Sequence, residues 1–83
     1  MTTQQAVCER IRELMREKKM SANKLAERSG VHHSTLDGML ADQPTINNTG
    51  IVTIKKLCQG FGISFKHFFD SPLFRERNLE YEE

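Results

Sequence analysis

Cysteine and proline are scarce in this sequence, with two residues of each among 83. Cys8 and Cys58 stand far apart along the chain, and neither has a CxxC partner. A disulfide-stapled secreted scaffold is therefore disfavoured. We expect two reduced thiols, with Cys58 in the core and Cys8 near the surface.

Long apolar runs are missing as well. No segment approaches the roughly 20 apolar residues that span a bilayer, and the polar N-terminus lacks the pattern of a signal peptide. The sequence has few prolines and no low-complexity segment, so we see no linker between domains. A chain of 83 residues is long enough for one modest hydrophobic core. The sequence therefore predicts one small domain in the cytoplasm, with no membrane partner.

Motifs that carry enzyme chemistry are also lacking. There is no phosphate-cradling glycine loop, no GxSxG and no HExxH. The neighbouring His32 and His33 do not make a zinc site by themselves, because zinc normally takes four nitrogen or sulfur ligands at suitable spacing. A small helical bundle also leaves little room for a catalytic pocket. We expect no enzymatic activity, no metal and no cofactor.

Charge is present in both signs but is unevenly placed. Up to Lys66 there are ten Lys or Arg against six Asp or Glu, which gives +4, whereas the remainder carries −3. A mildly basic body with an acidic end is compatible with nucleic acid on one face. A solvated surface without a partner explains the same numbers, so charge leaves both interpretations open.

Apolar residues recur at helical spacing in five short segments, and no strand pattern is present. The expected helices cover about residues 5–18, 22–29, 33–40, a segment after Asn48 that ends at Phe61, and 65–69. The charged side chains of the first helix are expected to be solvated. Ser21 caps the second helix, and Gly30 ends it in the left-handed conformation. Two short helices around such a turn are a helix-turn-helix unit.

Two runs of residues carry a family resemblance. RIRELMREKKMSANKLAERSGVHHSTLDGML, followed by IVTIKKLCQGFGISFKHFF, resembles the lambda repressor and Cro-like (XRE-type) helix-turn-helix regulators over roughly Glu9 to Phe69. The extension FFDSPLF is similar to small stand-alone regulators of this family in bacteria and their mobile elements. The resemblance implies an all-α, compact five-helix domain over residues 1–74, followed by an acidic, flexible tail over 75–83.

The function that the resemblance implies is transcription regulation by sequence-specific binding of double-stranded DNA. Such proteins bind a near-palindromic operator, usually as a homodimer, with the third helix in the major groove. Carried over by position, the DNA-binding residues are Ser21, His32, His33, Ser34, Thr35, Asp37, Gly38, Asn47 and Asn48. In that set Ser21 and His32 lie near phosphates, and the two asparagines contact the backbone. His33 and Ser34 meet base edges, where His33 can donate to a guanine acceptor and Ser34 can donate or accept.

Three of these residues carry an argument of their own. The Thr35 methyl can touch a thymine methyl if it points outward, and Asp37 can accept from a cytosine amino group or exclude non-target DNA. Gly38 weakens a helix by about 1 kcal/mol. It permits either close approach of the backbone to DNA or tight packing, and both interpretations stay open.

Aromatic residues gather near the C-terminus. Phe65, Phe68 and Phe69 are expected mainly in the core. The competing interpretation is that Phe69, Leu73 and Phe74 extend past the core and form a dimer contact. Lys55 and Lys56 approach phosphates or remain solvated.

Departures from the family pattern motivate an alternative function. Ala22 replaces a frequent glutamine, Gly38 replaces a long polar reader, and the loop after the third helix holds no Lys or Arg. The alternative is a protein-protein interaction module, an adaptor or antitoxin-like partner with weak or no DNA binding. A third hypothesis is pH sensing through His32 and His33, since free imidazoles titrate near pH 6.5.

Overall fold

The computed structural model describes residues 1–42 and 48–81. Within these residues the chain forms five α-helices and no strand, as the sequence predicts, followed by two short 3-10 helices. The elements are α1 (Thr3–Lys18), α2 (Ala22–Ser29), α3 (His33–Leu40), α4 (Ile51–Phe61), α5 (Phe65–Phe69), η1 (Pro72–Phe74) and η2 (Glu76–Asn78).

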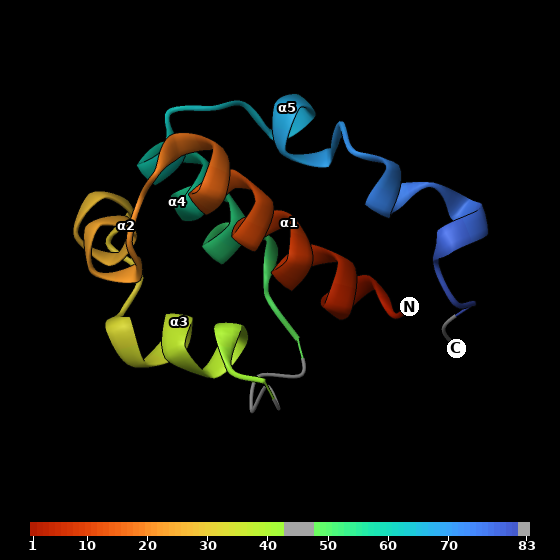
Figure 1. Cartoon of the computed structure of the whole chain (residues 1–83), viewed down its shortest axis with the longest axis horizontal. Coiled ribbons are helices and arrows are strands. Elements are labelled where there is room, and N and C mark those ends of the chain that lie inside the picture. Colours follow the sequence, from red (N-terminus) through yellow and green to blue (C-terminus); the bar gives the residue numbers. More distant parts are fainter. Residues whose placement is uncertain (43–47, 82–83) are drawn as a thin grey trace.

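The helices surround a single core, and α3 and α5 lie at opposite sides of the molecule (Figure 1). Each helix contributes at least one buried side chain to this core. The largest fully buried ones are Ile11, Leu14, Leu25, Leu36, Met39, Leu57, Cys58 and Phe68. The periodic residues of all five predicted helices therefore meet in one place, which confirms the predicted all-α fold.

The first helix is buried more widely than its amphipathic pattern indicates. Arg10 is only 6% exposed, and its Nε and Nη2 donate to the carbonyl oxygens of Phe68 at 2.7 Å and His67 at 2.8 Å. The expectation of a solvated charged face on α1 is wrong at this position, because α5 ends against it. The guanidinium supplies further donors at the end of α5, where the His67 carbonyl also accepts from the Asp70 backbone N–H at 3.2 Å.

Cys8 is also buried, at 3% exposure, so its predicted place near the surface is wrong. The amide of Gln4 covers this side of α1 by bonding the segment that leads into α4. Gln4 Nε2 donates to Thr49 Oγ1 at 2.7 Å, and its Oε1 accepts from the Thr49 backbone N–H at 2.8 Å. Burial follows from this long-range contact, which no local pattern reveals.

The start of α4 differs from the prediction that Asn48 caps it. The N-cap is Gly50, which offers no side-chain hydrogen bond to the helix. Helix α4 begins at Ile51, and the side chains of Ile51 and Val52 in its first turn are 62% and 65% exposed. Ile51 thus departs from the buried row that its spacing predicted.

The C-terminal segment lies beside the N-terminus (Figure 1). The Met1 ammonium donates to the Asn78 carbonyl at 3.0 Å, and the Glu80 backbone N–H donates to the Met1 carbonyl at 2.8 Å. The division of the chain into a domain over 1–74 and a flexible acidic tail remains a prediction.

Helices α2 and α4 approach each other closely where Gly60 faces Ser29. A Cβ atom at position 60 would lie 2.8 Å from Ser29 Cβ and 3.0 Å from both Ser29 Cα and Ser29 N. These atoms belong to the backbone or are fixed to it, so they cannot rotate away. Only glycine at position 60 permits this distance between the two helices.

Replacing Gly60→Ala is therefore expected to destabilise the fold. Alanine gains about 1 kcal/mol of helix propensity, but separating α2 from α4 costs more, and we expect a net loss of about 1–2 kcal/mol. Urea unfolding measures the change. Gln59→Ala, at an exposed neighbour in the same helix, serves as the control and should change stability by less than about 0.5 kcal/mol. A Gly60→Ala variant as stable as the parent would contradict the close contact.

Candidate nucleic-acid interface

The turn between α2 and α3 is held by local hydrogen bonds. Gly30 adopts the left-handed conformation at φ 74°, and its N–H donates to the Ala26 carbonyl at 3.0 Å. The Ser29 hydroxyl accepts from the Val31 backbone N–H at 3.1 Å, and the Val31 side chain is buried. These contacts confirm the helix-turn-helix unit and fix the direction in which α3 leaves α2.

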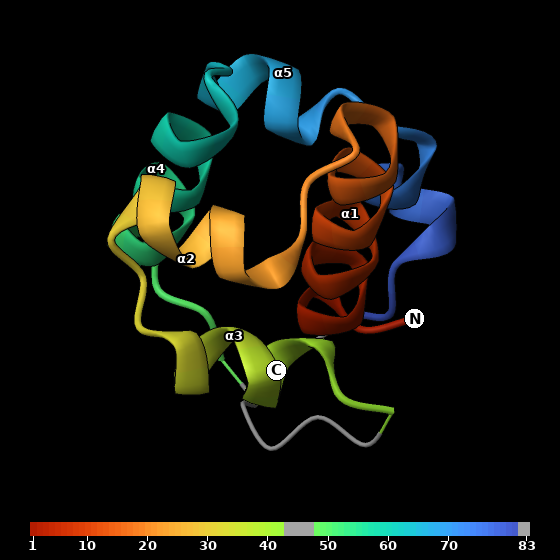
Figure 2. The same cartoon turned by 60° about the vertical axis from the view of Figure 1, so that its left-hand side comes forward.

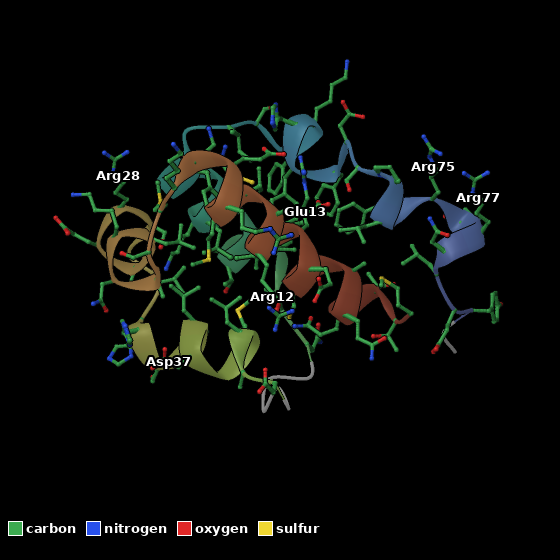
Figure 3. The ribbon with its side chains drawn as sticks, viewed as in Figure 1. Arg12, Glu13, Arg28, Asp37, Arg75 and Arg77 are labelled. Carbon is green, nitrogen blue, oxygen red and sulfur yellow. The ribbon has the colours of Figure 1, made fainter. Side chains whose placement is uncertain are left out.

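Helix α3 has one buried side and one exposed side. Leu36 and Met39 are fully buried, whereas His33, Ser34 and Asp37 are exposed. Two views of the molecule show α3 along one edge, and none of the other described helices covers its outer side (Figure 1 and Figure 2). Asp37 lies on that outer side (Figure 3). A rod of this size and exposure fits the major groove of duplex DNA.

The far end of α3 is held by Arg12, which reaches across from α1 (Figure 3). Its Nη2 donates to the carbonyl of Leu40 at 3.1 Å and to that of Ala41 at 3.4 Å, and its Nη1 pairs with Glu9. These carbonyls belong to the last turn of α3 and the residue after it, where no intrahelical donor follows. Sequence reasoning treated Arg12 as a solvated residue and missed this contact.

Two histidines stand at the start of α3. His32 is the N-cap, and its Nδ1 accepts from the Ser34 backbone N–H at 3.2 Å and lies 2.7 Å from Ser34 Oγ. His33 occupies the first helical position, and its Nδ1 lies 3.0 Å from Asp37 Oδ2, one turn further along. Both rings are exposed. The predicted DNA-binding residues His32, His33, Ser34 and Asp37 are thus brought together in two side-chain pairs.

The remaining predicted contacts lie around this face. Ser21 is exposed and caps α2 by accepting from the Lys24 backbone N–H at 3.2 Å, as predicted. Thr35 and Gly38 are half-buried within α3, and Asn48 is exposed before α4. Asn47 lies outside the described residues. The assignment of these side chains to DNA stays a prediction.

A basic groove lies where α1 ends and α2 runs past α4. We call it the basic groove, and the residues that line it are Lys18, Lys19, Met20, Ser21, Lys24, Arg28 and Phe61. Arg28 projects from α2 (Figure 3). Ser21, already predicted to meet a phosphate, belongs to the same lining, so the groove places four cationic side chains beside that position. These cations were not singled out in the sequence analysis. The repeat of Lys24 and Arg28 at i and i+4 was the available signal.

The candidate dimer residues gather beside α5. Phe69 is 37% exposed, and its ring centroid lies 5.0 Å from that of Phe68 and 4.9 Å from that of Phe74. Phe74 is half-buried and packs against the core, and Leu73 is half-buried as well. Phe69 therefore presents the largest exposed apolar side chain of the three.

The two cysteines are separate from this surface. Burial raises the pKa of the Cys8 thiol, against the opposing effect of the nearby Arg12 charge, and burial also raises the pKa of the Cys58 thiol. Both therefore remain protonated thiols at neutral pH.

Over residues 1–42 and 48–81, no group of three or more His, Cys, Asp or Glu side chains is placed to hold a metal ion. No helix in the same residues is both long and apolar enough to cross a bilayer.

Comparison with known proteins gives one family and one fold. The family model of the Cro/C1-type helix-turn-helix DNA-binding domain matches residues 10–70. Two solved structures of the restriction-modification controller protein C.Esp1396I are similar to the chain. A point mutant of it has a TM-score of 0.72 at 22% identity, covering 84% of this chain and 87% of that chain. The wild-type structure has a TM-score of 0.71 at 21% identity, and the match covers 84% of this chain and 90% of that chain. At this identity the likeness establishes the fold. A comparison with curated proteins gave no match.

The contact from Arg12 predicts a local effect on α3. In Arg12→Met the carbonyls of Leu40 and Ala41 lose a charged donor, so the last turn of α3 should open more often. We expect hydrogen exchange of its backbone amides to accelerate about tenfold, with α4 unchanged. Amide exchange followed by NMR measures this. Arg16→Met, at an exposed position of the same helix, is the matched control. Equal exchange in the two variants would show that Arg12 does not hold α3.

Proposed function

Because the chain belongs to the family of Cro/C1-type helix-turn-helix DNA-binding domains, we propose that it is a non-enzymatic transcription regulator that acts in the cytoplasm. It binds a specific double-stranded DNA sequence as a homodimer, with α3 in the major groove. The observation that carries the proposal is the exposed outer side of α3, whose two ends are fixed by separate contacts. A helix held in this way keeps its polar side chains at constant positions relative to base edges.

Side chains in the first turns of α3 read the bases. His33 and Ser34 are exposed there. Short polar side chains at these positions can reach the donor and acceptor patterns that distinguish base pairs in the major groove. The second α3 of a dimer would lie about 34 Å away and read the other half of a near-palindromic site.

The basic groove provides the affinity for the phosphate backbone. Lys18, Lys19, Lys24 and Arg28 line it together with Ser21, which opens α2 next to α3. Cations gathered in one groove attract DNA even though the net charge of the chain is only +1. The groove supplies the cations that the loop between α3 and α4 lacks.

Selection of bound duplexes from a random pool tests the proposal. We expect one enriched, near-palindromic sequence, whose binding weakens steeply as salt rises because bound phosphates release counterions. The double variant His33→Ala, Ser34→Ala should lose preference for that sequence. No enriched sequence would contradict DNA reading. If the double variant bound the selected duplex as tightly as the parent but lost a protein partner, the alternative of a protein-interaction module would replace the proposal.

Salt dependence tests the basic groove separately. The double variant Lys18→Gln, Lys19→Gln should reduce the slope of log affinity against log salt by about 0.9 for each phosphate that the chain no longer neutralises. Arg75→Gln, Arg77→Gln is the matched control, because these two cations lie at the opposite end of the molecule from α2 (Figure 3). A slope unchanged by the lysine variant, or changed equally by the arginine variant, would contradict phosphate binding at the groove.

The proposed dimer uses Phe69 together with Leu73 and Phe74. We expect Phe69→Ser to raise the dimer dissociation constant about tenfold or more in sedimentation equilibrium, because the variant removes an exposed apolar anchor. Circular dichroism checks that the variant remains folded. The control is the double variant Ile51→Ser, Val52→Ser, which removes the exposed apolar pair at the start of α4. Dissociation caused by the control and not by Phe69→Ser would place the dimer contact at α4 instead.

A further inference from the structure

The two histidines at the start of α3 use the same ring nitrogen in opposite ways. His32 Nδ1 lies 3.2 Å from the Ser34 backbone nitrogen, which can only donate a hydrogen bond. Nδ1 of His32 must therefore carry a lone pair, and the proton of the neutral ring sits on Nε2. The Ser34 hydroxyl, 2.7 Å from the same Nδ1, can donate to it as well.

His33 has the reverse arrangement. Its Nδ1 lies 3.0 Å from Asp37 Oδ2, and an ionised carboxylate only accepts hydrogen bonds. Nδ1 of His33 must therefore carry the proton, so Nε2 of the neutral ring carries the lone pair. Asp37 stands four residues after His33, one helical turn along the same face, so α3 itself sets the spacing of this pair. These proton positions follow from the chemistry of the partners rather than from observed hydrogens.

We propose that Ser34 and Asp37 fix opposite tautomers on the two neighbouring histidines, so that His32 offers an Nε2–H donor and His33 an Nε2 acceptor. The inference rests on the proposed function, because it states what each ring then does on DNA. The His32 donor suits a phosphate oxygen. The His33 acceptor suits an exocyclic amino group, which adenine and cytosine present in the major groove. Guanine presents two acceptors there, which an acceptor on His33 cannot pair with.

Asp37 is then a positioning residue for His33 and not itself the reader of a base. Its carboxylate repels phosphates, and its hydrogen bond to Nδ1 keeps the ring from turning over. This role differs from direct acceptance from cytosine, because it depends on the acceptor atom that faces Nδ1 and not on the negative charge. An asparagine at position 37 can present its carbonyl oxygen to the same Nδ1, whereas an alanine cannot.

The first experiment measures the tautomers in the free protein. Long-range proton–nitrogen NMR of the full chain at pH 8, where a free imidazole is neutral, distinguishes the two neutral forms. We expect the Nε2–H form for His32 and the Nδ1–H form for His33, with the exposed His67 as the internal reference. The Nε2–H form on His33 would overturn the proposal. So would a loss of the Nδ1–H form in Asp37→Ala with no return in Asp37→Asn.

The second experiment measures base preference with the selected duplexes. The parent and Asp37→Asn should favour adenine or cytosine over guanine at the position that His33 reads, and Asp37→Ala should reduce this preference about tenfold. A preference that Asp37→Asn changes as much as Asp37→Ala would overturn the proposal in favour of direct reading by the carboxylate. Absence of any selected duplex would overturn the proposed function and the base preference together. The tautomers of the free protein would still be measured in that case, so the two failures are distinguishable.

Discussion

The close approach of α2 to α4, at Ser29 and Gly60, is the contact on which the candidate interface depends. Ser29 ends α2, and its hydroxyl holds the Val31 backbone N–H in the turn. The backbone of Gly60 in α4 packs directly against Ser29 and fixes its position, because a methyl group at position 60 would not fit between them. The direction of α3 therefore follows from how closely α4 supports the end of α2.

Charged side chains of α1 complete this support at two other points. Arg12 holds the carbonyls at the end of α3, and Arg10 holds those at the end of α5. Both arginines donate to carbonyl oxygens at helix ends, where few intrahelical donors remain. In this way α1 connects the exposed side of the molecule, where α3 lies, with the opposite side formed by α5 (Figure 1). The candidate interface is thus supported by contacts distributed over α1, α2 and α4.

Much of the fold could be predicted because its determinants are local. Ser21 caps α2, Gly30 ends it in the left-handed conformation, and the helical spacing of apolar residues marks the core. Apart from the start of α4, where Gly50 and not Asn48 is the N-cap, the errors occur where distant segments meet. Cys8 is covered through Gln4 and Thr49, and Arg10 is covered by α5, and neither contact is visible in local periodicity.

The candidate interface was predictable in part for the same reason. The position of α3 and its exposed polar residues follow from the helix-turn-helix pattern. The pairing of Nδ1 on His32 and His33 with different partners depends on side-chain rotamers, and the basic groove depends on how the end of α1 lies beside α2. Neither arrangement follows from the spacing of residue types alone.

The most direct test of DNA reading by α3 is an NMR titration of the nitrogen-labelled chain with its selected duplex. If α3 enters the major groove, the largest amide shifts should fall on residues 32–38 and on the first turn of α2. The 3-10 helices η1 and η2 should shift little. Shifts confined to the start of α4 or to the C-terminal segment, with α3 unaffected, would contradict the claim that α3 reads DNA.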